Sequence, residues 1–362
     1  MGLGPYPEVD LKSARAMAAG HHKSIQSGID PLEERAARKQ QDDASRQSSS
    51  NRGTTFSAAA EDYIASHKGG WKNAKHADQW KNTLTTYAYP AIGTKPIADV
   101  TTDDVLAILK PIWETKTETA SRVRSRIELV ISSAKAKKVF HGENPAAWKG
   151  HLDALLPRPT RVKKVRNQPA LPYERISLFM GMLRQRLGTS ARALEFLILT
   201  AARSSEVREA TWNEFDLEQA LWTVPASRMK AGKEHRVPLS PAALAIINAL
   251  PRTTEGVYVF QGAKRTAPLS DMTLTAIIRR ENKKRPNDER WVERTTNAEV
   301  VPHGFRSTFR DWASDIGQYP QDLAESALAH TIRNEAERAY RRFDMLERRR
   351  GMMNEWANYC NP

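Results

Sequence analysis

The sequence predicts a mainly α-helical protein with a small β-sheet (α+β), divided into more than one domain. Apolar residues recur at helical spacing over most of the chain. Only two short segments, LWTVPA and HRVPLS, alternate apolar and polar residues as strands do. Because 362 residues exceed what one hydrophobic core normally holds, two or three domains are expected.

The charge of the chain indicates a polyanionic partner. Lys and Arg number 56 against 42 Asp and Glu, which gives a net charge of +14. A chain with this charge binds polyanions favourably, because their counterions are released. Nucleic acid is the leading candidate, and an anionic membrane surface is the alternative.

Neither a targeting signal nor a metal site is evident. No run approaches the roughly eighteen apolar residues of a membrane span, and the start MGLGPYPEVD lacks the layout of a signal peptide. The only cysteine, Cys360, excludes an intrachain disulfide and a multi-thiolate zinc site. We therefore expect a soluble cytoplasmic protein without a membrane partner, a metal or another cofactor.

The N-terminal residues 1–39 are too few for a core of their own. A helix is expected from Leu11 to just before Gly28, followed by a short charged helix that Asp30 caps. This segment is interpreted as the remnant of a larger domain or as a docking appendage. Residues 40–55 are polar, Ser-rich and without apolar periodicity, which predicts a flexible linker.

The next segment, residues 56–158, predicts a small basic helical domain. Its third helical pattern is capped by Thr101 or Thr102, and its fourth has Val123 and Ile127 at core spacing. The basic face of the fourth pattern suits DNA, although such charges can also merely solubilise a helix. The four patterns cover residues 56–67, 74–88, 102–113 and 119–138, and the basic residues are Arg122, Arg124, Arg126, Lys135, Lys137 and Lys138.

A basic linker, residues 159–170, connects this domain to the last one, residues 171–362. The run RPTRVKKVR has no acidic residue, so we expect an extended, positively charged tether. The last domain begins with a helix from Pro172 to about Leu187, followed by a mostly apolar helix that Ser190 caps.

The remainder of the last domain is expected to contain a hairpin and further helices. The segments LWTVPA and HRVPLS form the hairpin, and helices over residues 241–250 and 271–282 follow. The chain ends in an amphipathic helix. Its Met and aromatic face is favoured to pack within the subunit, with docking on a neighbouring protomer as the alternative. The residues of this face are Met345, Met352, Trp356 and Tyr359.

The segment VPHGFRSTFRDWASDIGQYPQDLAESALAHTIRNEAERAY carries the candidate chemistry. His303 and Arg306 are three residues apart, on one face of a helix, and His330 and Tyr340 follow at the ends of two later helical runs. A guanidinium binds phosphate oxygens in a planar fork, imidazoles donate hydrogen bonds or protons, and a phenol is a potential nucleophile. Each residue alone is more often a packing or surface residue.

Basic side chains earlier in the domain extend this set. Arg203 directly follows a buried apolar helix, and Glu206, one turn later, either holds its guanidinium or forms a surface pair. Lys230 and Lys233 lie between the two strands, at the mobile tip of the hairpin.

Taken in chain order, these residues resemble the catalytic set of the tyrosine recombinases, most closely that of prophage and genomic-island integrases. The resemblance implies a helical core-binding domain in residues 56–158, a mixed α/β catalytic domain in residues 171–362 and the end of an arm-binding domain in residues 1–39. Ala202 and Ala329 stand where Gly is common in the family. The matching segments are LILTAARSSEVREATW, RMKAGKEHRVPLS, VPHGFRSTFRDWA, LAHTIRNEAERAYRR and RRGMMNEWANY, which contain Arg203, Lys230, His303, Arg306, His330 and Tyr340.

The resemblance implies a mechanism in which Tyr340 attacks a DNA phosphate. The attack forms a 3′-phosphotyrosyl link and releases a 5′-hydroxyl, and a partner's 5′-hydroxyl reverses the step. The bond energy stays in the phosphodiester, so neither ATP nor a metal is needed. Arg203 and Arg306 would bind the non-bridging oxygens, with His330 as a third donor.

Proton transfer falls to the two remaining residues of the set. Lys230 can protonate the leaving oxygen while His303 takes the proton of the tyrosine, and the reverse assignment stays open. A phenol needs such help because its pKa is about 10.

The resemblance also implies partners. These are double-stranded DNA attachment sites, other copies of the chain in a tetramer on DNA, a DNA-bending host factor and an excisionase, at the bacterial nucleoid. Two other classes of protein remain as alternatives. A type IB topoisomerase-like enzyme would use similar chemistry on one duplex, which the integrase-like C-terminal helix disfavours. A DNA-binding protein with a degenerate site would cleave nothing, which the complete residue set disfavours.

Overall fold

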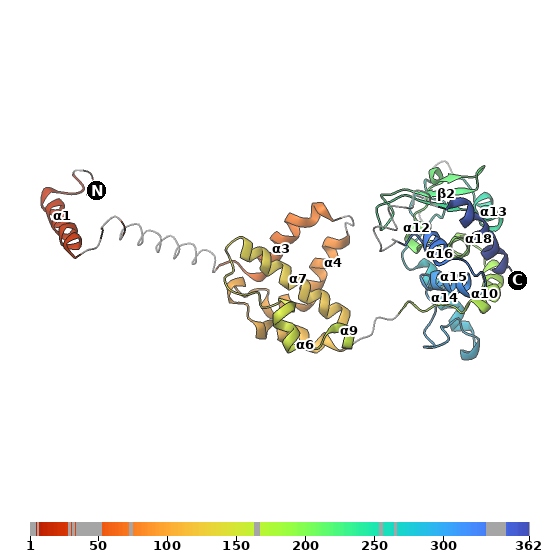
Figure 1. Ribbon diagram of the computed structural model, residues 1–362, viewed down its shortest axis with the longest axis horizontal. Coiled ribbons are helices and arrows are strands. Elements are labelled where there is room, and N and C mark those ends of the chain that lie inside the picture. The colour runs from red at the N-terminus through yellow and green to blue at the C-terminus, as the bar shows by residue number, and fades with distance from the viewer. Residues whose placement is uncertain are drawn as a thin grey trace. The chain divides into compact units, whose positions relative to one another are not determined.

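A computed structural model of the chain divides into two compact units, Met1–Val165 and Arg166–Pro362, coloured from red to yellow and from green to blue in Figure 1. Among the residues described, none of the helices combines the length and the apolar composition that a bilayer span requires. The structure describes residues 7–27, 53–71, 75–162, 167–252, 256–263, 266–330 and 345–361, with residues 5, 30 and 33.

The first unit contains the four helices expected between residues 56 and 138. The third of them starts where the sequence places a cap: the Thr101 side chain accepts from the backbone N–H of Asp104, and the Asp104 carboxylate accepts from that of Thr101. The helices of this unit are α1 Leu11–Gln26, α3 Phe56–His67, η1 Lys68–Gly70, α4 Lys75–Tyr87, α5 Tyr89–Ile92, η2 Ile97–Asp99, α6 Thr102–Trp113, α7 Thr117–Ala136, η3 Trp148–Leu152, α8 Asp153–Leu155 and α9 Pro159–Val162.

The central helix of this unit is α7, which packs against α3, α4 and α6. Val123 and Ile127 are fully buried, as their spacing predicts. Arg126, expected on the basic face, is buried instead. Its guanidinium donates to the carbonyl oxygen of Gln79 at 2.7 Å and lies over the ring of Trp80. The expectation that Arg126 belongs to an exposed basic face is therefore wrong, because an indole and a backbone carbonyl hold it inside.

The basic linker also differs from its expectation at one end. Residues 159–170 were expected to be extended, yet the first part forms α9, Pro159–Val162, which packs against α7. Val162 lies against the apolar core of the first unit. Residues 163–166 lie outside the described residues. The linker therefore begins as a helical turn, because Val162 gains apolar contacts there.

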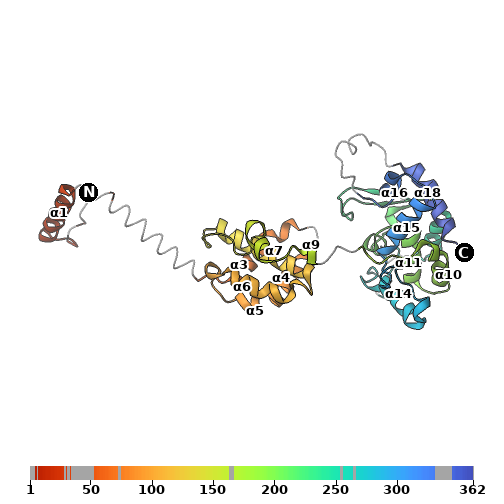
Figure 2. The same cartoon turned by 60° about the horizontal axis from the view of Figure 1, so that its bottom comes forward.

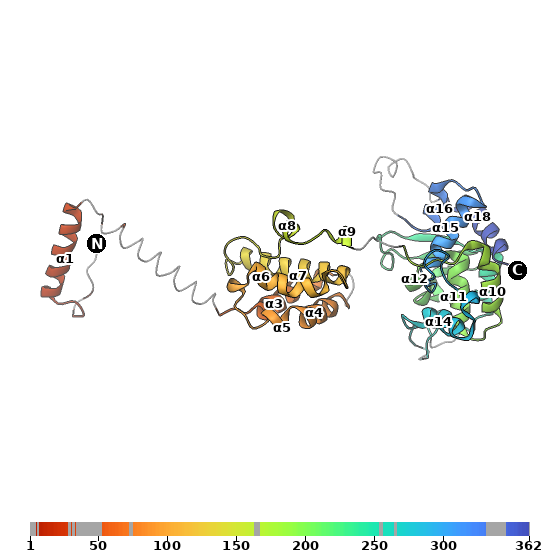
Figure 3. The ribbon, with the colours of Figure 1, turned by 90° about the horizontal axis from the view of Figure 1, so that it is seen from below.

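The second unit is built round α11, which is buried along most of its length. It packs against α10, α13, α14, α15 and α18, as Figures 2 and 3 show for α10, α14 and α15. The elements of this unit are η4 Tyr173–Arg175, α10 Ile176–Arg184, α11 Thr189–Thr200, α12 Ser204–Arg208, η5 Trp212–Glu214, β1 Phe215–Asp216, β2 Leu221–Val224, β3 His235–Pro238, α13 Pro241–Ala249, α14 Thr273–Lys284, η6 Asn287–Glu289, α15 Gly304–Asp315, α16 Gln321–Ala327 and α18 Leu346–Tyr359.

The small expected sheet is present and antiparallel, in the order β1-β2-β3. Strands β2 and β3 form the predicted hairpin, with Val224 opposite His235. The sequence did not reveal β1, because Phe215–Asp216 is too short to show an alternation. The Ser190 cap is wrong: α11 starts at Thr189, and Gly188, with a φ of +100°, precedes it without a side-chain cap.

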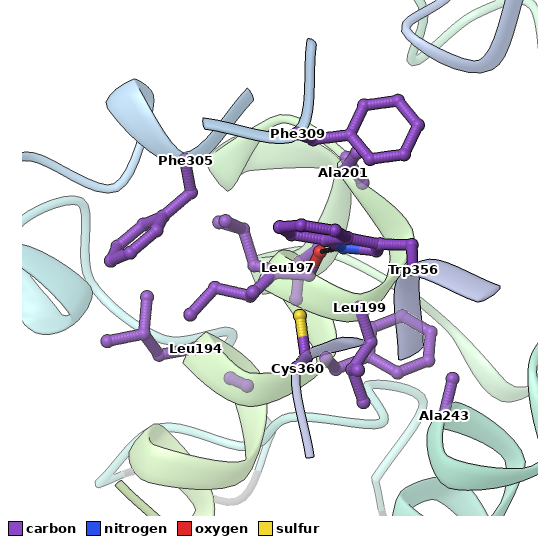
Figure 4. Close-up of a cluster of buried hydrophobic side chains, with 14 of the residues drawn as sticks. Leu194, Leu197, Leu199, Ala201, Ala243, Phe305, Phe309, Trp356 and Cys360 are labelled. Atoms are coloured by element: carbon purple, nitrogen blue, oxygen red, sulfur yellow. Dashed lines mark hydrogen bonds between the residues drawn. The ribbon is translucent and has the colours of Figure 1, made fainter. Parts of the chain in front are cut away.

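The C-terminal helix α18 packs into the core of its own subunit. This confirms the interpretation that the sequence analysis favoured. Trp356 is fully buried, and its indole N–H donates to the carbonyl oxygen of Ile198 at 2.8 Å. Figure 4 shows this indole between α11 and the ring of Phe309 on α15. Met352 is also fully buried. The alternative in which this face docks on a neighbouring protomer would first require α18 to leave the core.

Replacing Trp356 with Ala should therefore destabilise the second unit. The variant loses a fully buried ring and a hydrogen bond to α11, which costs about 3–5 kcal/mol of unfolding free energy. Denaturant unfolding followed by circular dichroism measures the loss. The exposed Asn358 on the same helix is the control, because Asn358→Ala should stay within about 0.5 kcal/mol of wild type. Unchanged stability of Trp356→Ala, together with impaired assembly on DNA, would favour docking between protomers.

Candidate active site

Arg306 is the buried centre of the candidate site. It lies in the first turn of α15 and exposes 4% of its surface. Its Nη1 donates to the carbonyl oxygen of Ala201 at 2.6 Å, and its Nη2 donates to that of Leu328 at 2.5 Å. Burial, followed by the nearby charge of Arg203, lowers its pKa to about 10. The side chain therefore stays charged at neutral pH while it is held inside the protein.

Arg203 lies beside Arg306, at the start of α12. Its Nη1 pairs with Oε1 of Glu206 at 2.7 Å, while the other carboxylate oxygen accepts from the Arg203 backbone N–H at 2.9 Å. Its Nη2 donates to the carbonyl oxygen of Ala329 at 3.2 Å. Glu206 is buried. Of the two roles considered for Glu206, the structure shows that it holds Arg203.

His330 follows the end of α16 and completes a contact with Arg306. Its Nε2 lies 3.0 Å from Nη2 of Arg306, and its Nδ1 lies 2.5 Å from Oε2 of Glu325. A carboxylate can only accept, so Nδ1–H of His330 donates to Glu325, which leaves Nε2 facing the guanidinium. Glu325 also accepts from Nε of Arg310 at 2.9 Å. Burial opposes the ionisation of Glu325, but its contacts with His330 and Arg310 together outweigh burial and lower its pKa.

His303 is placed by a close approach between backbone segments. It precedes α15 as the N-cap residue, and Gly304 follows. A Cβ atom at Gly304 would lie 1.9 Å from the carbonyl oxygen of Pro169, so glycine is needed there. Partial desolvation, then the charges of Arg306 and Arg203, lower the pKa of His303 below its usual value. The exposed ring is therefore neutral at neutral pH.

Lys230 and Tyr340 complete the predicted set. Lys230 is exposed between β2 and β3, and its charge contributes to the lowered pKa of His303. Tyr340 lies outside the described residues. The structure thus brings Arg203, Arg306 and His330 into one cluster joined through shared partners, with His303 and Lys230 within electrostatic reach.

This cluster can bind an anion such as a phosphate. Each guanidinium offers five N–H donors, and its contacts with the described residues use only part of them. The carbonyl oxygens at the ends of α11 and α16 hold Arg306, leaving a net positive charge that a phosphate can offset. Within the described part of the chain, no group of His, Cys, Asp and Glu has an arrangement that would hold a metal.

Three residues of this region escaped the sequence analysis. Glu325, five residues before His330, gave no signal, because a helix end lies between them and breaks the helical spacing. Arg349 on α18 is 1% exposed, although a run of arginines looks like a solvated face. His235 at the start of β3 is half-buried, and burial followed by the charge of Arg349 lowers its pKa to about 4.

Known families match the chain in three consecutive segments. The model of the phage integrase family matches residues 174–347, that of the phage integrase central domain matches residues 56–151, and that of an arm DNA-binding domain matches residues 1–38.

Curated relatives match the chain over nearly its whole length. The prophage integrase IntZ of Escherichia coli (strain K12) is 31% identical, over 98% of this chain and 82% of the relative. The integrase of Enterobacteria phage P4 is 30% identical, over 100% of this chain and 80% of the relative.

Solved structures share the fold at low sequence identity. A lambda integrase dimer bound to a COC′ core site has a TM-score of 0.60 and 17% identity, over 93% of this chain and 88% of that one. A lambda integrase tetramer bound to a Holliday junction has a TM-score of 0.59 and 18% identity, over 95% and 91%. The Tn1549 transposon integrase in complex with circular intermediate DNA has a TM-score of 0.56 and 15% identity, over 80% and 100%.

The backbone beside His330 offers a test of local strain. Ala329 has a φ of +48°, a left-handed conformation that favours glycine. Two alanines, Ala202 and Ala329, stand where related proteins commonly have glycine. Of these two, only Ala329 adopts the left-handed conformation. Before Arg203, the left-handed residue is Ala201 and not Ala202. We expect Ala329→Gly to raise the free energy of unfolding by about 0.5 kcal/mol.

Ala327→Gly is the matched control for this substitution. Ala327 is the last residue of α16 and is buried, so the same change should lower the unfolding free energy by about 1 kcal/mol. Chemical denaturation of both variants measures the two signs. Equal destabilisation of the two would show that Ala329 carries no strain.

Proposed function

The chain belongs to the phage integrase family, and on that premise we propose how its residues carry out site-specific recombination of DNA. The enzyme cleaves and rejoins duplex DNA through a 3′-phosphotyrosyl intermediate, and so integrates or excises a mobile element. The observation that carries the proposal is the cluster of Arg203, Arg306 and His330. Arg306 contacts His330 directly, and both arginines bind backbone carbonyl oxygens just before His330.

The first chemical step is an in-line substitution at phosphorus. The phenol oxygen of Tyr340 forms a bond to the phosphorus, the bond from phosphorus to the 5′ oxygen breaks, and that oxygen leaves as a hydroxyl. Arg203 and Arg306 bind the non-bridging oxygens, where negative charge concentrates in the transition state. One phosphodiester replaces another, so attack by the 5′-hydroxyl of a partner strand reverses the step and joins the exchanged strands.

His330 acts as the third donor to the phosphate. Its Nε2 lies 3.0 Å from Nη2 of Arg306, so the two groups border the same position. Its Nδ1 faces the carboxylate of Glu325 at 2.5 Å, which fixes the orientation of the ring. His330 would therefore present its Nε2 to the phosphate oxygen that Arg306 binds.

His303 and Lys230 transfer the protons. The lowered pKa of His303 keeps its ring neutral near pH 7, so it can accept the proton of Tyr340. The ammonium group of Lys230 gives a proton to the leaving 5′ oxygen. The neutral state of His303 favours this assignment over the reverse one.

The domains and partners follow from the same premise. Residues 56–158 serve as the core-binding domain, residues 171–362 as the catalytic domain, and residues 1–39 as part of an arm-binding domain. The lambda integrase tetramer bound to a Holliday junction supports assembly of four copies on two attachment sites. A DNA-bending host factor and an excisionase at the nucleoid of a bacterial cell complete the proposal.

Removal of the nucleophile tests the proposal most directly. Tyr340→Phe removes one hydroxyl and keeps the ring, so a gel-shift assay should give near wild-type DNA binding. A denaturing gel should show no protein-linked DNA on a nicked suicide duplex. Arg203→Lys should still form the adduct, about a hundredfold more slowly, because the charge persists without the bidentate fork.

Two results would contradict this function. An adduct formed by Tyr340→Phe would move the nucleophile to another phenol. Wild-type protein that relaxes a supercoiled plasmid but never joins two attachment sites would favour the topoisomerase-like alternative.

The pH dependence of cleavage tests the role of His303. A general base must be neutral, and burial and the neighbouring cations lower the pKa of His303, so the single-turnover rate should rise with pH through the acidic range and level off toward neutrality. His303→Gln keeps the size of the side chain but cannot take the proton. This variant should cleave about a hundredfold more slowly and should lose the acidic limb. An unchanged acidic limb in the variant would assign the base to another residue.

A further inference from the structure

The hairpin tip that carries Lys230 is held at both ends. The tip, residues 230–234, is exposed along its whole length. The residues that flank it are Arg228 and the buried Met229 on the β2 side and His235 on the β3 side. An exposed loop with small and charged residues samples many conformations unless its ends are fixed. The position of Lys230 therefore depends on these flanking residues.

Arg228 fixes the first end of the tip. Its Nη1 forms an ion pair with the buried carboxylate of Glu214, at 2.5 Å from Oε2. Its Nη2 donates to the backbone carbonyl oxygen of Glu206 at 2.6 Å. Glu214 also accepts from the indole N–H of Trp222 on β2 at 2.9 Å. This end is therefore tied to the helix α12, whose Glu206 side chain holds Arg203.

His235 fixes the second end. Its backbone pairs with Val224 across the hairpin, and its ring faces the backbone of Ala327, which favours the protonated ring. Ala327 is the last residue of α16, three residues before His330. The ring is neutral because burial, then the charge of Arg349, lowers its pKa to about 4, although Glu206 opposes this. This end is therefore tied to the segment that leads into His330.

We propose that Arg228 and His235 are positioning residues that place Lys230 against the leaving 5′ oxygen. Each binds a backbone segment that continues into a phosphate-binding residue: α12 begins just after Arg203, and α16 ends just before His330. A phosphate held by those two residues thus lies at a fixed place relative to the tip. The proposal rests on the proposed role of Lys230 as the proton donor.

The alternative is that both contacts only stabilise the fold. A purely structural defect would slow every cleavage reaction alike. A positioning defect slows only the part of the reaction that depends on the proton from Lys230. The two cases separate on a DNA substrate whose leaving 5′ oxygen is replaced by sulfur, because a thiol has a pKa of about 8.5 and leaves as a thiolate without a proton donor.

The experiment compares single-turnover cleavage of matched oxygen and sulfur suicide duplexes by the full chain. His235→Leu removes the ring donor at similar volume. Arg228→Met is made together with Glu214→Gln, so that no buried carboxylate loses its partner while the bond from Trp222 can persist. We expect both variants to cleave the oxygen duplex about a hundredfold more slowly and the sulfur duplex within about threefold of wild type.

Two controls separate this inference from the proposed function. Lys230→Ala should show the same selective recovery on sulfur, whereas Arg203→Ala should be slow on both duplexes. If Lys230→Ala does not recover on sulfur, the role of Lys230 as acid is wrong. Two results would overturn the positioning proposal when Lys230→Ala does recover on sulfur. In the first, His235→Leu and the Arg228→Met pair are equally slow on both duplexes. In the second, these variants cleave the oxygen duplex at the wild-type rate.

A third variant covers the case in which either substitution unfolds the protein. Two glycines inserted after Gly232 lengthen the exposed tip and leave Arg228, His235 and the core untouched. Thermal unfolding should match wild type, while cleavage of the oxygen duplex falls and that of the sulfur duplex does not. Wild-type cleavage of the oxygen duplex by this variant would show that tethering at both ends does not place Lys230.

Discussion

A buried guanidinium needs acceptors on every side, and the architecture of the second unit supplies them to Arg306 from two helix ends. Its partners are the carbonyl oxygens of Ala201 and Leu328 and the ring of His330. The last carbonyls of a helix lack partners within the helix and carry partial negative charge, so they suit a cation. If α11 or α16 shifted, a charged group would be left buried and unsatisfied, which is costly. The arginine therefore fixes the mutual position of α11, α15 and α16, and the rest of the site is assembled on that frame.

The sequence was informative wherever the determinant of structure is local. Thr101 with Asp104 predicted the start of α6, and the apolar spacing round Val123 predicted the buried face of α7. The strands β2 and β3 appeared as alternating segments, whereas β1 is too short to do so. These signals lie within one or two turns of the residues they describe.

Contacts between distant parts of the chain carried no such signal. Arg126 looked like part of a basic face, and only its distance of 2.7 Å from the carbonyl of Gln79 reveals that it points inward. Glu325 gains its role from His330 and Arg310, and His235 gains its role from Ala327 on another element. The candidate residues Arg203, Arg306 and His330, which the structure brings together, could be singled out because their residue types are distinctive. The residues that orient this set could not, since a glutamate or a histidine with a structural partner looks the same in sequence as one without.

In the proposed mechanism, the positive charges of the site also connect substrate binding to proton transfer. Burial lowers the pKa of His303, and the charges of Arg306, Arg203 and Lys230 add to this effect. A DNA phosphate that binds to the two arginines brings a negative charge into the same field and offsets it. The pKa of His303 then rises back toward its ordinary value, which makes the ring a stronger base once the substrate is present. On this proposal, the same positive charge that attracts a phosphate also sets the basicity of His303, so one electrostatic feature serves both recognition and catalysis.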